Sequence, residues 1–154
     1  MRRANPPSQP EPGAAAIARP GFLRRMGAVI YDALLLLAVL FLATALALPF
    51  NGGEAFAASQ VLYPIYLLAV SFAFYGWFWT HGGQTLGLKA WKIKVVSANA
   101  QPLGWPQATL RFFSALLSWA CLGLGFLWCL LDKDRQGWHD RLSKTRVVYC
   151  EEKR

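Results

Sequence analysis

One carboxylate lies at a position where a charge is costly. Asp32 is the only charged residue between Met26 and Leu48, in a stretch that is otherwise almost entirely apolar. It lies six residues after Met26, which corresponds to roughly 9 Å along a helix. An aspartate at the centre of a membrane helix costs about 2.5–3.5 kcal/mol, and such a residue usually faces a polar partner or a wet cavity. Asp32 is therefore predicted either to bind a proton or a cation, or to hold helices together through a buried hydrogen bond.

Two arginines are candidate partners for a buried carboxylate. Arg25 precedes Asp32 by seven residues, and seven steps of 100° place the two within about 20° of the same helical face. They are roughly 10 Å apart along the axis, so a direct pair requires a bend or a bridging water. Arg111 lies at the start of another apolar stretch. For both arginines the alternative role is an interfacial anchor whose charged head reaches water.

A glycine-rich run from His81 to Lys89 carries Gln84 and Thr85. The run is not a P-loop, because no serine or threonine follows the lysine and no strand is predicted before it. Two roles are open. The run either ends a helix and allows close backbone packing, or it presents its amide and hydroxyl groups to a ligand.

The tail places an imidazole beside a carboxylate, at His139 and Asp140. No serine or cysteine with a recognisable nucleophile elbow accompanies them, so we expect no enzymatic activity and predict that the pair anchors the tail by hydrogen bonds. The cysteines lack both a CxxC pair and a metal-ligand spacing with either histidine, and neither a metal nor another cofactor is expected. They are Cys121, Cys129 and Cys150.

Three hydrophobic segments must position these side chains. They cover residues 26–48, 59–79 and 112–131. Each is long enough to cross a bilayer core about 30 Å thick, which needs roughly 20 apolar residues of helix. The chain is 55% hydrophobic and 16% charged, a composition outside the usual range of soluble domains. We therefore predict an integral membrane protein.

The basic residues indicate its orientation. The net charge is +8, and the lysines and arginines flank the hydrophobic segments. This arrangement is typical of cytoplasmic loops that meet anionic headgroups, and we do not expect nucleic-acid binding. The connection between the first two segments has Glu54 as its only charge. By the positive-inside rule this connection faces away from the cytoplasm, and the N-terminus is cytoplasmic.

Two β-branched stretches, 91–96 and 145–149, predict short strands that pair if they lie on the same side of the membrane. That condition leaves two alternatives for the segment 112–131. Its length favours a spanning helix, whereas the basic tail, the strand pair and the glycines of 121–125 favour a re-entrant segment. The predicted fold is an all-α membrane protein with three hydrophobic helical segments, the third spanning or re-entrant, and a short cytoplasmic β-strand pair.

Composition divides the chain into three parts. Residues 1–20 hold five of the nine prolines and are predicted to be a disordered tail. Residues 21–150 form the membrane domain, and residues 151–154 are a charged C-terminal end.

The order of these motifs resembles the RDD family of bacterial membrane proteins, over roughly residues 20–150. The arginine and two aspartates of the family's name correspond to Arg25, Asp32 and Asp140, with Asp132 and Asp134 as alternatives for the second aspartate. The motifs that carry the resemblance are Arg25-x-x-Ala28-x-x-x-Asp32, Gly83-Gln84-Thr85-Leu86-Gly87, Lys92-Ile93-Lys94-Val95-Val96, Arg111, and the tail run from His139 to Val148.

The resemblance implies a multi-pass protein of the bacterial inner membrane whose molecular role is largely unassigned, with sodium/proton antiport reported for some relatives. Two hypotheses follow. In the first, Asp32 exchanges a proton or Na⁺ and Arg25 tunes its proton affinity, in a homo-oligomer or in a complex with other membrane proteins. In the second, the chain is a non-transporting scaffold or accessory subunit, in which Arg25, Asp32, Gln84 and Asp140 form one polar cluster that locks the helix packing.

Overall fold

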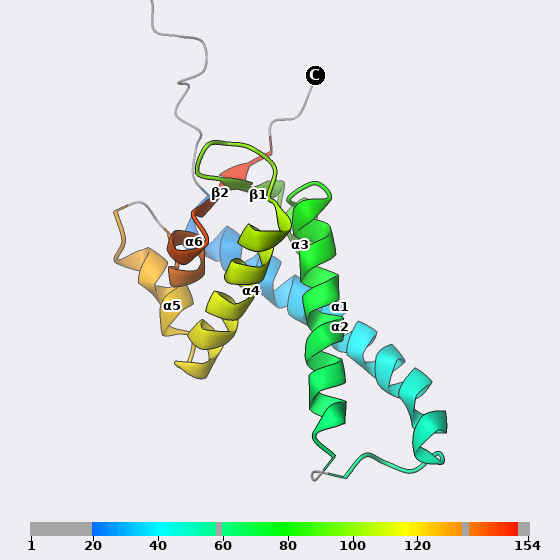
Figure 1. Cartoon of the computed structure of the whole chain (residues 1–154). Coiled ribbons are helices and arrows are strands. Elements are labelled where there is room, and N and C mark those ends of the chain that lie inside the picture. The colour runs from blue at the N-terminus through cyan, green and yellow to red at the C-terminus, as the bar shows by residue number, and fades with distance from the viewer. Residues whose placement is uncertain (1–19, 58–59, 134–135, 151–154) are drawn as a thin grey trace, which may run out of the picture.

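The computed structural model describes residues 20–57, 60–133 and 136–150. This part of the chain is mostly helical and contains a two-stranded antiparallel sheet (Figure 1). Apart from Pro20, the predicted disordered tail lies outside the described residues, and so does the charged end 151–154.

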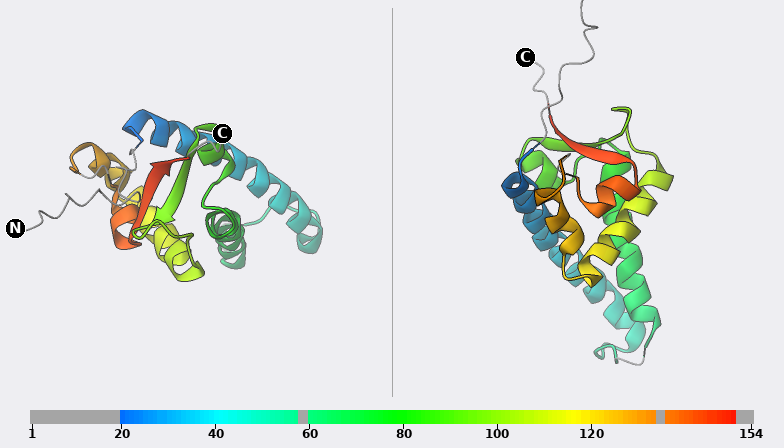
Figure 2. Two further views of the ribbon diagram at one scale, coloured as in Figure 1. Left: turned by 90° about the horizontal axis from the view of Figure 1, so that it is seen from above. Right: turned by 90° about the vertical axis from the view of Figure 1, so that its left-hand side faces the viewer.

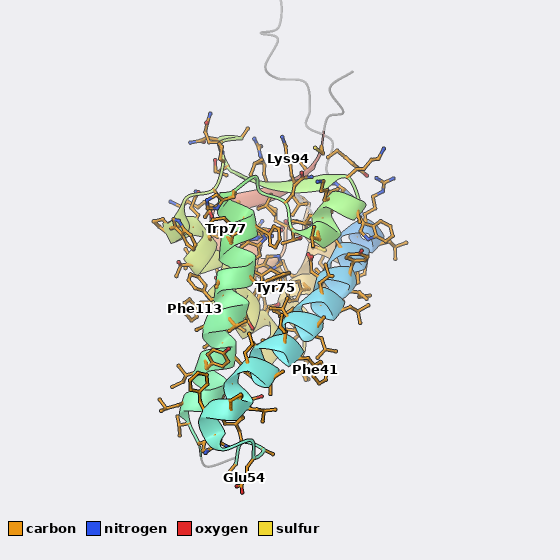
Figure 3. All side chains as sticks on the ribbon, turned by 90° about the vertical axis from the view of Figure 1, so that its right-hand side faces the viewer. Phe41, Glu54, Tyr75, Trp77, Lys94 and Phe113 are labelled. Atoms are coloured by element: carbon orange, nitrogen blue, oxygen red, sulfur yellow. The ribbon has the colours of Figure 1, made fainter. Side chains whose placement is uncertain are left out.

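Two long helices form an antiparallel hairpin that extends away from the sheet (Figure 1). Helix α1 covers Phe22–Ala47 and continues into the short 3-10 helix η1, Leu48–Asn51. Helix α2 covers Leu62–Thr80. Both helices are long and apolar enough to cross a membrane, as the segments 26–48 and 59–79 predict. Figure 3 shows Glu54 at the far tip of this hairpin and Lys94 at the opposite end of the molecule.

The two predicted strands pair with each other. Strand β1 covers Ile93–Ser97 and strand β2 covers Thr145–Tyr149, and Val95 lies opposite Val147. Each strand follows a one-turn or slightly longer helix that the sequence pattern does not predict. These are α3, Leu86–Ala90, and α6, Trp138–Leu142.

The third hydrophobic segment is not one continuous helix. Helix α4 covers Trp105–Ala120, so it begins seven residues before the predicted hydrophobic segment 112–131. Pro106 lies in its first turn, where a missing N–H costs nothing. The chain then bends by 108° into α5, Leu124–Leu127, and the 3-10 helix η2, Trp128–Leu130. Gly123 adopts a left-handed conformation at the bend, with φ of 78°.

The bend returns the chain toward the sheet. Helix α4 runs away from the sheet and α5 runs back beside it (Figure 1), and β2 then pairs with β1. Of the two alternatives for the segment 112–131, the structure contains the one in which the chain turns back.

The core lies beneath the sheet, where the sheet ends of α1, α2 and α4 meet (Figure 2). It includes Ala28 of α1, Trp79 of α2 and Phe112 of α4, packed against Ile93 and Val95 of β1. The described part of the chain is therefore held together at its sheet end, and the far half of the α1–α2 hairpin projects from it.

The glycine-rich run connects α2 to this core. Gly83 has a φ of 69°, and its carbonyl accepts a hydrogen bond of 2.7 Å from the backbone N–H of Val95. A side chain at Gly83 would collide with the carbonyl oxygen of Val95. The run thus ends a helix and brings two backbones together, which is the first of the two roles left open for it.

Candidate functional site

Asp140 is fully buried at the centre of a cluster of charges. The first turn of α6 carries Asp140, and the side chain has no exposed surface. Arg25 of α1 donates a hydrogen bond to Asp140 Oδ2. Arg111 Nη1 of α4 donates to Oδ1 at 2.5 Å, and the N–H of Gly137 donates to Oδ2 at 3.2 Å. One carboxylate therefore joins α1, α4 and α6.

Burial and the neighbouring charges together control the protonation of this centre. Burial by itself would raise the pKa of Asp140, but the positive charges of Arg111 and Arg25 bring it well below its usual range. Burial lowers the pKa of the neighbouring His139 to about 4, against a smaller opposing effect of Asp140. Near neutral pH the centre therefore contains an ionised Asp140 and an uncharged His139.

The cluster extends to the sheet through hydroxyl groups. Arg111 Nη1 also donates to Thr145 Oγ1 of β2 at 2.6 Å. The hydroxyls of Thr145 and Ser143 lie 2.7 Å apart, and Ser143 donates to the carbonyl oxygen of His139 at 2.5 Å. The guanidinium of Arg111 also lies 5.2 Å from the ring centroid of Trp79, within the range of a cation–π contact.

Asp32 forms a second centre with uncharged donors. Its Oδ2 accepts a hydrogen bond from the Thr85 hydroxyl, and its Oδ1 accepts one of 2.8 Å from the N–H of Gly87. Thr85 also caps α3, because its hydroxyl accepts the N–H of Leu88 at 3.2 Å. A side-chain carbon at Gly87 would lie 2.8 Å from Asp32 Cγ. Asp32 thus fastens α1 to the start of α3, with no room for a larger residue at Gly87.

The polar residues singled out in the sequence therefore form two centres rather than one cluster. Arg25, Arg111, His139 and Asp140 come together, and Asp32 meets Thr85. Within the described ranges no ion pair joins Arg25 to Asp32. The expected single cluster is wrong in this respect, because Arg25 reaches a carboxylate far away in the sequence.

Gln84 belongs to neither centre. Its Nε2 donates to the carbonyl oxygen of Ile93 at 2.9 Å, so it joins the glycine-rich run to β1.

Sequence reasoning missed Gly87 and Gly137 as backbone donors and Thr145 as a partner of Arg111. Gly87 and Thr145 lie inside the motifs quoted above, but only the folded chain gives them a carboxylate or a guanidinium to bind.

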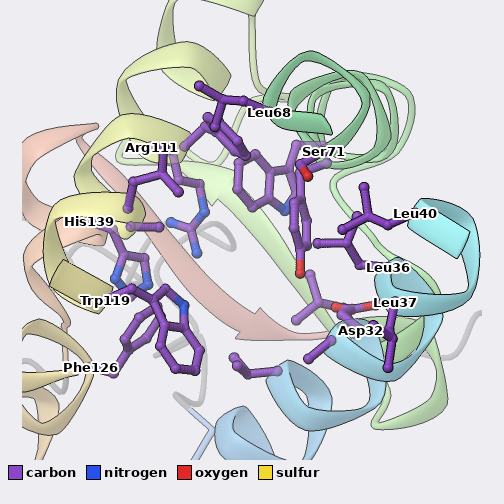
Figure 4. A pocket seen from close by; sticks show the side chains of 18 residues that line it. Asp32, Leu36, Leu37, Leu40, Leu68, Ser71, Arg111, Trp119, Phe126 and His139 are labelled. Carbon is purple, nitrogen blue, oxygen red and sulfur yellow. The ribbon is translucent and has the colours of Figure 1, made fainter. Parts of the chain in front are cut away.

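A cavity of about 390 Å³ lies between the two centres. Its walls come from α1, α2 and α4, with contributions from α5 and α6 (Figure 4). Asp32, Arg111 and His139 line it, and most of the remaining wall is aliphatic or aromatic. Residues of both centres therefore border one pocket.

The described ranges 20–57, 60–133 and 136–150 contain no group of three His, Cys, Asp or Glu residues arranged to hold a metal ion. The three cysteines of these ranges are free thiols.

Comparison with known proteins gives a family but no established role. The chain is 32% identical over 84 residues to the uncharacterized protein YxaI of Bacillus subtilis (strain 168), and the alignment covers 54% of this chain. It spans about half of that relative, 55% of its length. No solved structure matches. The model of the RDD family matches residues 19–144, and this chain therefore belongs to the RDD family.

Proposed function

We propose that the chain is a multi-pass protein of the bacterial inner membrane with its sheet, N-terminus and tail on the cytoplasmic side. Large apolar side chains along α1 are mostly exposed, with Leu34 64% and Phe41 69% exposed. A contiguous apolar surface of this kind is typical of membrane contact. The lysines that follow α2 lie at the sheet end and Glu54 lies at the opposite tip (Figure 3), as the positive-inside rule requires of this orientation.

A pair of reporter fusions tests the orientation. Green fluorescent protein fused after Arg154 should fluoresce, because it folds in the cytoplasm. Alkaline phosphatase fused at the same position should be inactive. An active phosphatase fusion with a dark fluorescent fusion would overturn the cytoplasmic assignment.

Within that membrane protein we propose a non-transporting scaffold or accessory role, in which both carboxylates are structural. The observation that carries this is that all four carboxylate oxygens of Asp32 and Asp140 accept hydrogen bonds from other segments of the chain. A buried charge that is fully satisfied fastens helices together and holds no free site for an ion. The proposal includes no enzymatic role, because the oxygens of both carboxylates already accept hydrogen bonds.

Cation/proton exchange at Asp32 is the second candidate. It is favoured by one observation, the position of Asp32 on the wall of the 390 Å³ cavity. An intramembrane carboxylate beside a cavity is a common feature of ion pathways. In this candidate the hydroxyl of Thr85 and the N–H of Gly87 give up Asp32 when a cation binds.

Proton flux in everted membrane vesicles separates the two candidates. Flux driven by Na⁺ or K⁺ is followed with a pH-sensitive dye for the wild type, for Asp32→Asn, and for Glu54→Gln as a control at the far tip. The scaffold role predicts no flux above empty vesicles in any of the three, with the protein confirmed present. Wild-type flux that survives in Glu54→Gln and disappears in Asp32→Asn at equal expression would establish exchange and overturn the scaffold role.

A further inference from the structure

The cavity between α1, α2 and α4 is larger than helix packing alone requires. Its volume of about 390 Å³ lies within the range of about 300–1,000 Å³ found for small-molecule sites. The contacts that hold the two carboxylate centres leave this space open. It is therefore a candidate site for a ligand.

One end of the cavity is polar. Figure 4 shows Arg111 and His139 on the wall formed by α4 and α6, and Asp32 on the facing wall of α1. Arg111 is 5% exposed, and its Nε has no hydrogen-bond partner within the described residues. His139 Nδ1 is also buried without a partner there. Buried polar atoms of this kind are stabilised when a ligand supplies a hydrogen bond.

The other end is apolar, and its direction is defined by α1. Leu36 and Leu40 follow Asp32 at intervals of four residues, so they line the same face one and two turns further from the sheet. Leu68 and Leu116 complete this end from α2 and α4. In the proposed orientation the polar end lies toward the cytoplasmic interface and the leucines lie toward the bilayer centre. A lipid of the cytoplasmic leaflet has the same polarity.

The groups around the polar end disfavour an anionic ligand. Arg25 and Arg111 already donate to Asp140, and the Asp32 oxygens on the facing wall are hydrogen-bond acceptors. An anionic head would therefore lie close to the electron-rich oxygens of Asp32, while both arginines are held by another carboxylate. An oxygen atom of an uncharged head accepts a hydrogen bond at lower cost in such a site.

We propose that this cavity binds a membrane amphiphile with an uncharged, oxygen-bearing head, with the head at Arg111 and a hydrocarbon tail along the leucines of α1. The inference rests on the membrane orientation proposed above, but not on whether the protein transports ions.

Tryptophan fluorescence tests the proposal directly. Trp79 and Trp119 line the cavity, and bromine atoms on a lipid tail quench tryptophan at contact. The purified full-length protein in detergent is titrated with a monoacylglycerol whose tail carries two bromines. We expect saturable quenching that an excess of unbrominated monooleoylglycerol reverses. Quenching that rises linearly without saturation would overturn the proposal.

A matched pair of substitutions on one helix locates the site. Ala115 of α4 lines the cavity, whereas Ala120 of the same helix is exposed and is not part of the wall. Ala115→Leu fills the space and should weaken binding at least tenfold, while Ala120→Leu should leave it unchanged. Equal affinity in the two variants would overturn the site assignment. If Ala115→Leu fails to fold, Leu40→Phe fills the same space from α1 and gives the same test.

The head group is tested by a second titration. Brominated phosphatidylglycerol, which is anionic, should quench at least tenfold less effectively than the brominated monoacylglycerol at the same concentration. Tighter binding of the anionic lipid, lost in Ala115→Leu, would overturn the uncharged head and assign the cavity to anionic lipid. The reporter fusions test the proposed orientation separately from lipid binding, because they measure only the side of the membrane on which the C-terminus lies.

Discussion

The two buried aspartates are held in different ways. Asp140 lies between Arg25 and Arg111 and has no exposed surface. Asp32 is almost as buried, at 5% exposure, but its donors are an uncharged hydroxyl and a backbone N–H. The first centre neutralises its charge with full countercharges, and the second solvates its charge with dipoles. The comparison shows that burial of a carboxylate requires donors but not necessarily a cation.

The two centres also differ in what they connect. Asp140 joins α1, α4 and α6, and through Arg111 it reaches β2. Asp32 joins only α1 and α3. Loss of Asp140 should therefore affect the whole sheet end of the molecule, whereas loss of the Asp32 contacts should act locally.

The largest predicted effect is that of Asp140→Asn. The substitution removes the carboxylate that pairs with the buried Arg111 and also with Arg25, which should cost about 3–5 kcal/mol of the free energy of unfolding. The measurement is unfolding of the purified protein in detergent by titration with dodecyl sulfate. A loss below about 1 kcal/mol would contradict the view that the two arginines depend on this carboxylate.

Asp132→Asn is the matched control. The Asp132 side chain is only 7% exposed, and it accepts hydrogen bonds from Arg141 at 2.7 Å and from the N–H of Gln136 at 3.0 Å. The Arg141 side chain, however, is 53% exposed, so its charge stays in water when the carboxylate is lost. Ion pairs near the surface contribute about 0–1 kcal/mol. The same chemical change should therefore have a small effect at this position, only a few residues from Asp140 in the chain.

The second effect is a dependence of stability on pH through His139. Its pKa of about 4 in the folded state lies below the ordinary value of 6.5, so the unfolded chain takes up the proton first as the pH falls. Stability should therefore decrease between pH 6.5 and 4, by at most about 1.4 kcal/mol per pH unit. Unfolding titrations at several pH values measure the slope.

Two variants sharpen the assignment of this slope to the Asp140 centre. His139→Gln should remove most of it, whereas His81→Gln, at an exposed histidine outside both centres, should retain it. Below about pH 4 a further loss should begin, because the pKa of Asp140 is lowered in the folded state: its contribution is complete above its ordinary pKa and decreases as the pH falls toward the lowered value. A slope that persists in His139→Gln would assign it to another group.

The smallest of the three effects is expected at the Asp32 centre. Thr85→Val keeps the shape of the side chain but removes the hydroxyl that donates a hydrogen bond to Asp32 and caps α3. This loss should lower the free energy of unfolding by about 1.5–3 kcal/mol. The same unfolding titration measures it. Thr85→Ser retains the hydroxyl and should lose much less. A larger loss in Thr85→Ser than in Thr85→Val would show that the methyl group of Thr85, and not its hydroxyl, stabilises this position.

Much of the fold follows from local pattern. The lengths of α1 and α2 come from uninterrupted apolar runs, and both strands come from short β-branched stretches. The turn in the third segment was one of two alternatives, because the residues 121–125 allow a bend but the run of apolar residues also allows a straight helix. Helices α3 and α6 were not predicted, because each has only five residues and a helical repeat of apolar residues cannot be recognised over so short a stretch.

The candidate site was predictable only in part. The cost of a charge in an apolar helix singled out Asp32, and that argument needs no tertiary information. Helical periodicity placed Arg25 on the same face as Asp32, and both residues do lie in one continuous helix, α1. The partner of Arg25 is nevertheless Asp140, 115 positions later in the chain.

By itself the sequence determined that the chain has long apolar helices, a basic sheet end and a small set of polar residues that cannot be left without partners. Their types and local spacing are enough for this, because hydrophobic length and the cost of a buried charge are local properties. Only the tertiary structure decided which donors each carboxylate receives, that the third segment turns back, and that a cavity lies between the two centres. Those outcomes depend on how α4 and α6 pack against α1, and contacts between distant segments have no local signature in the sequence.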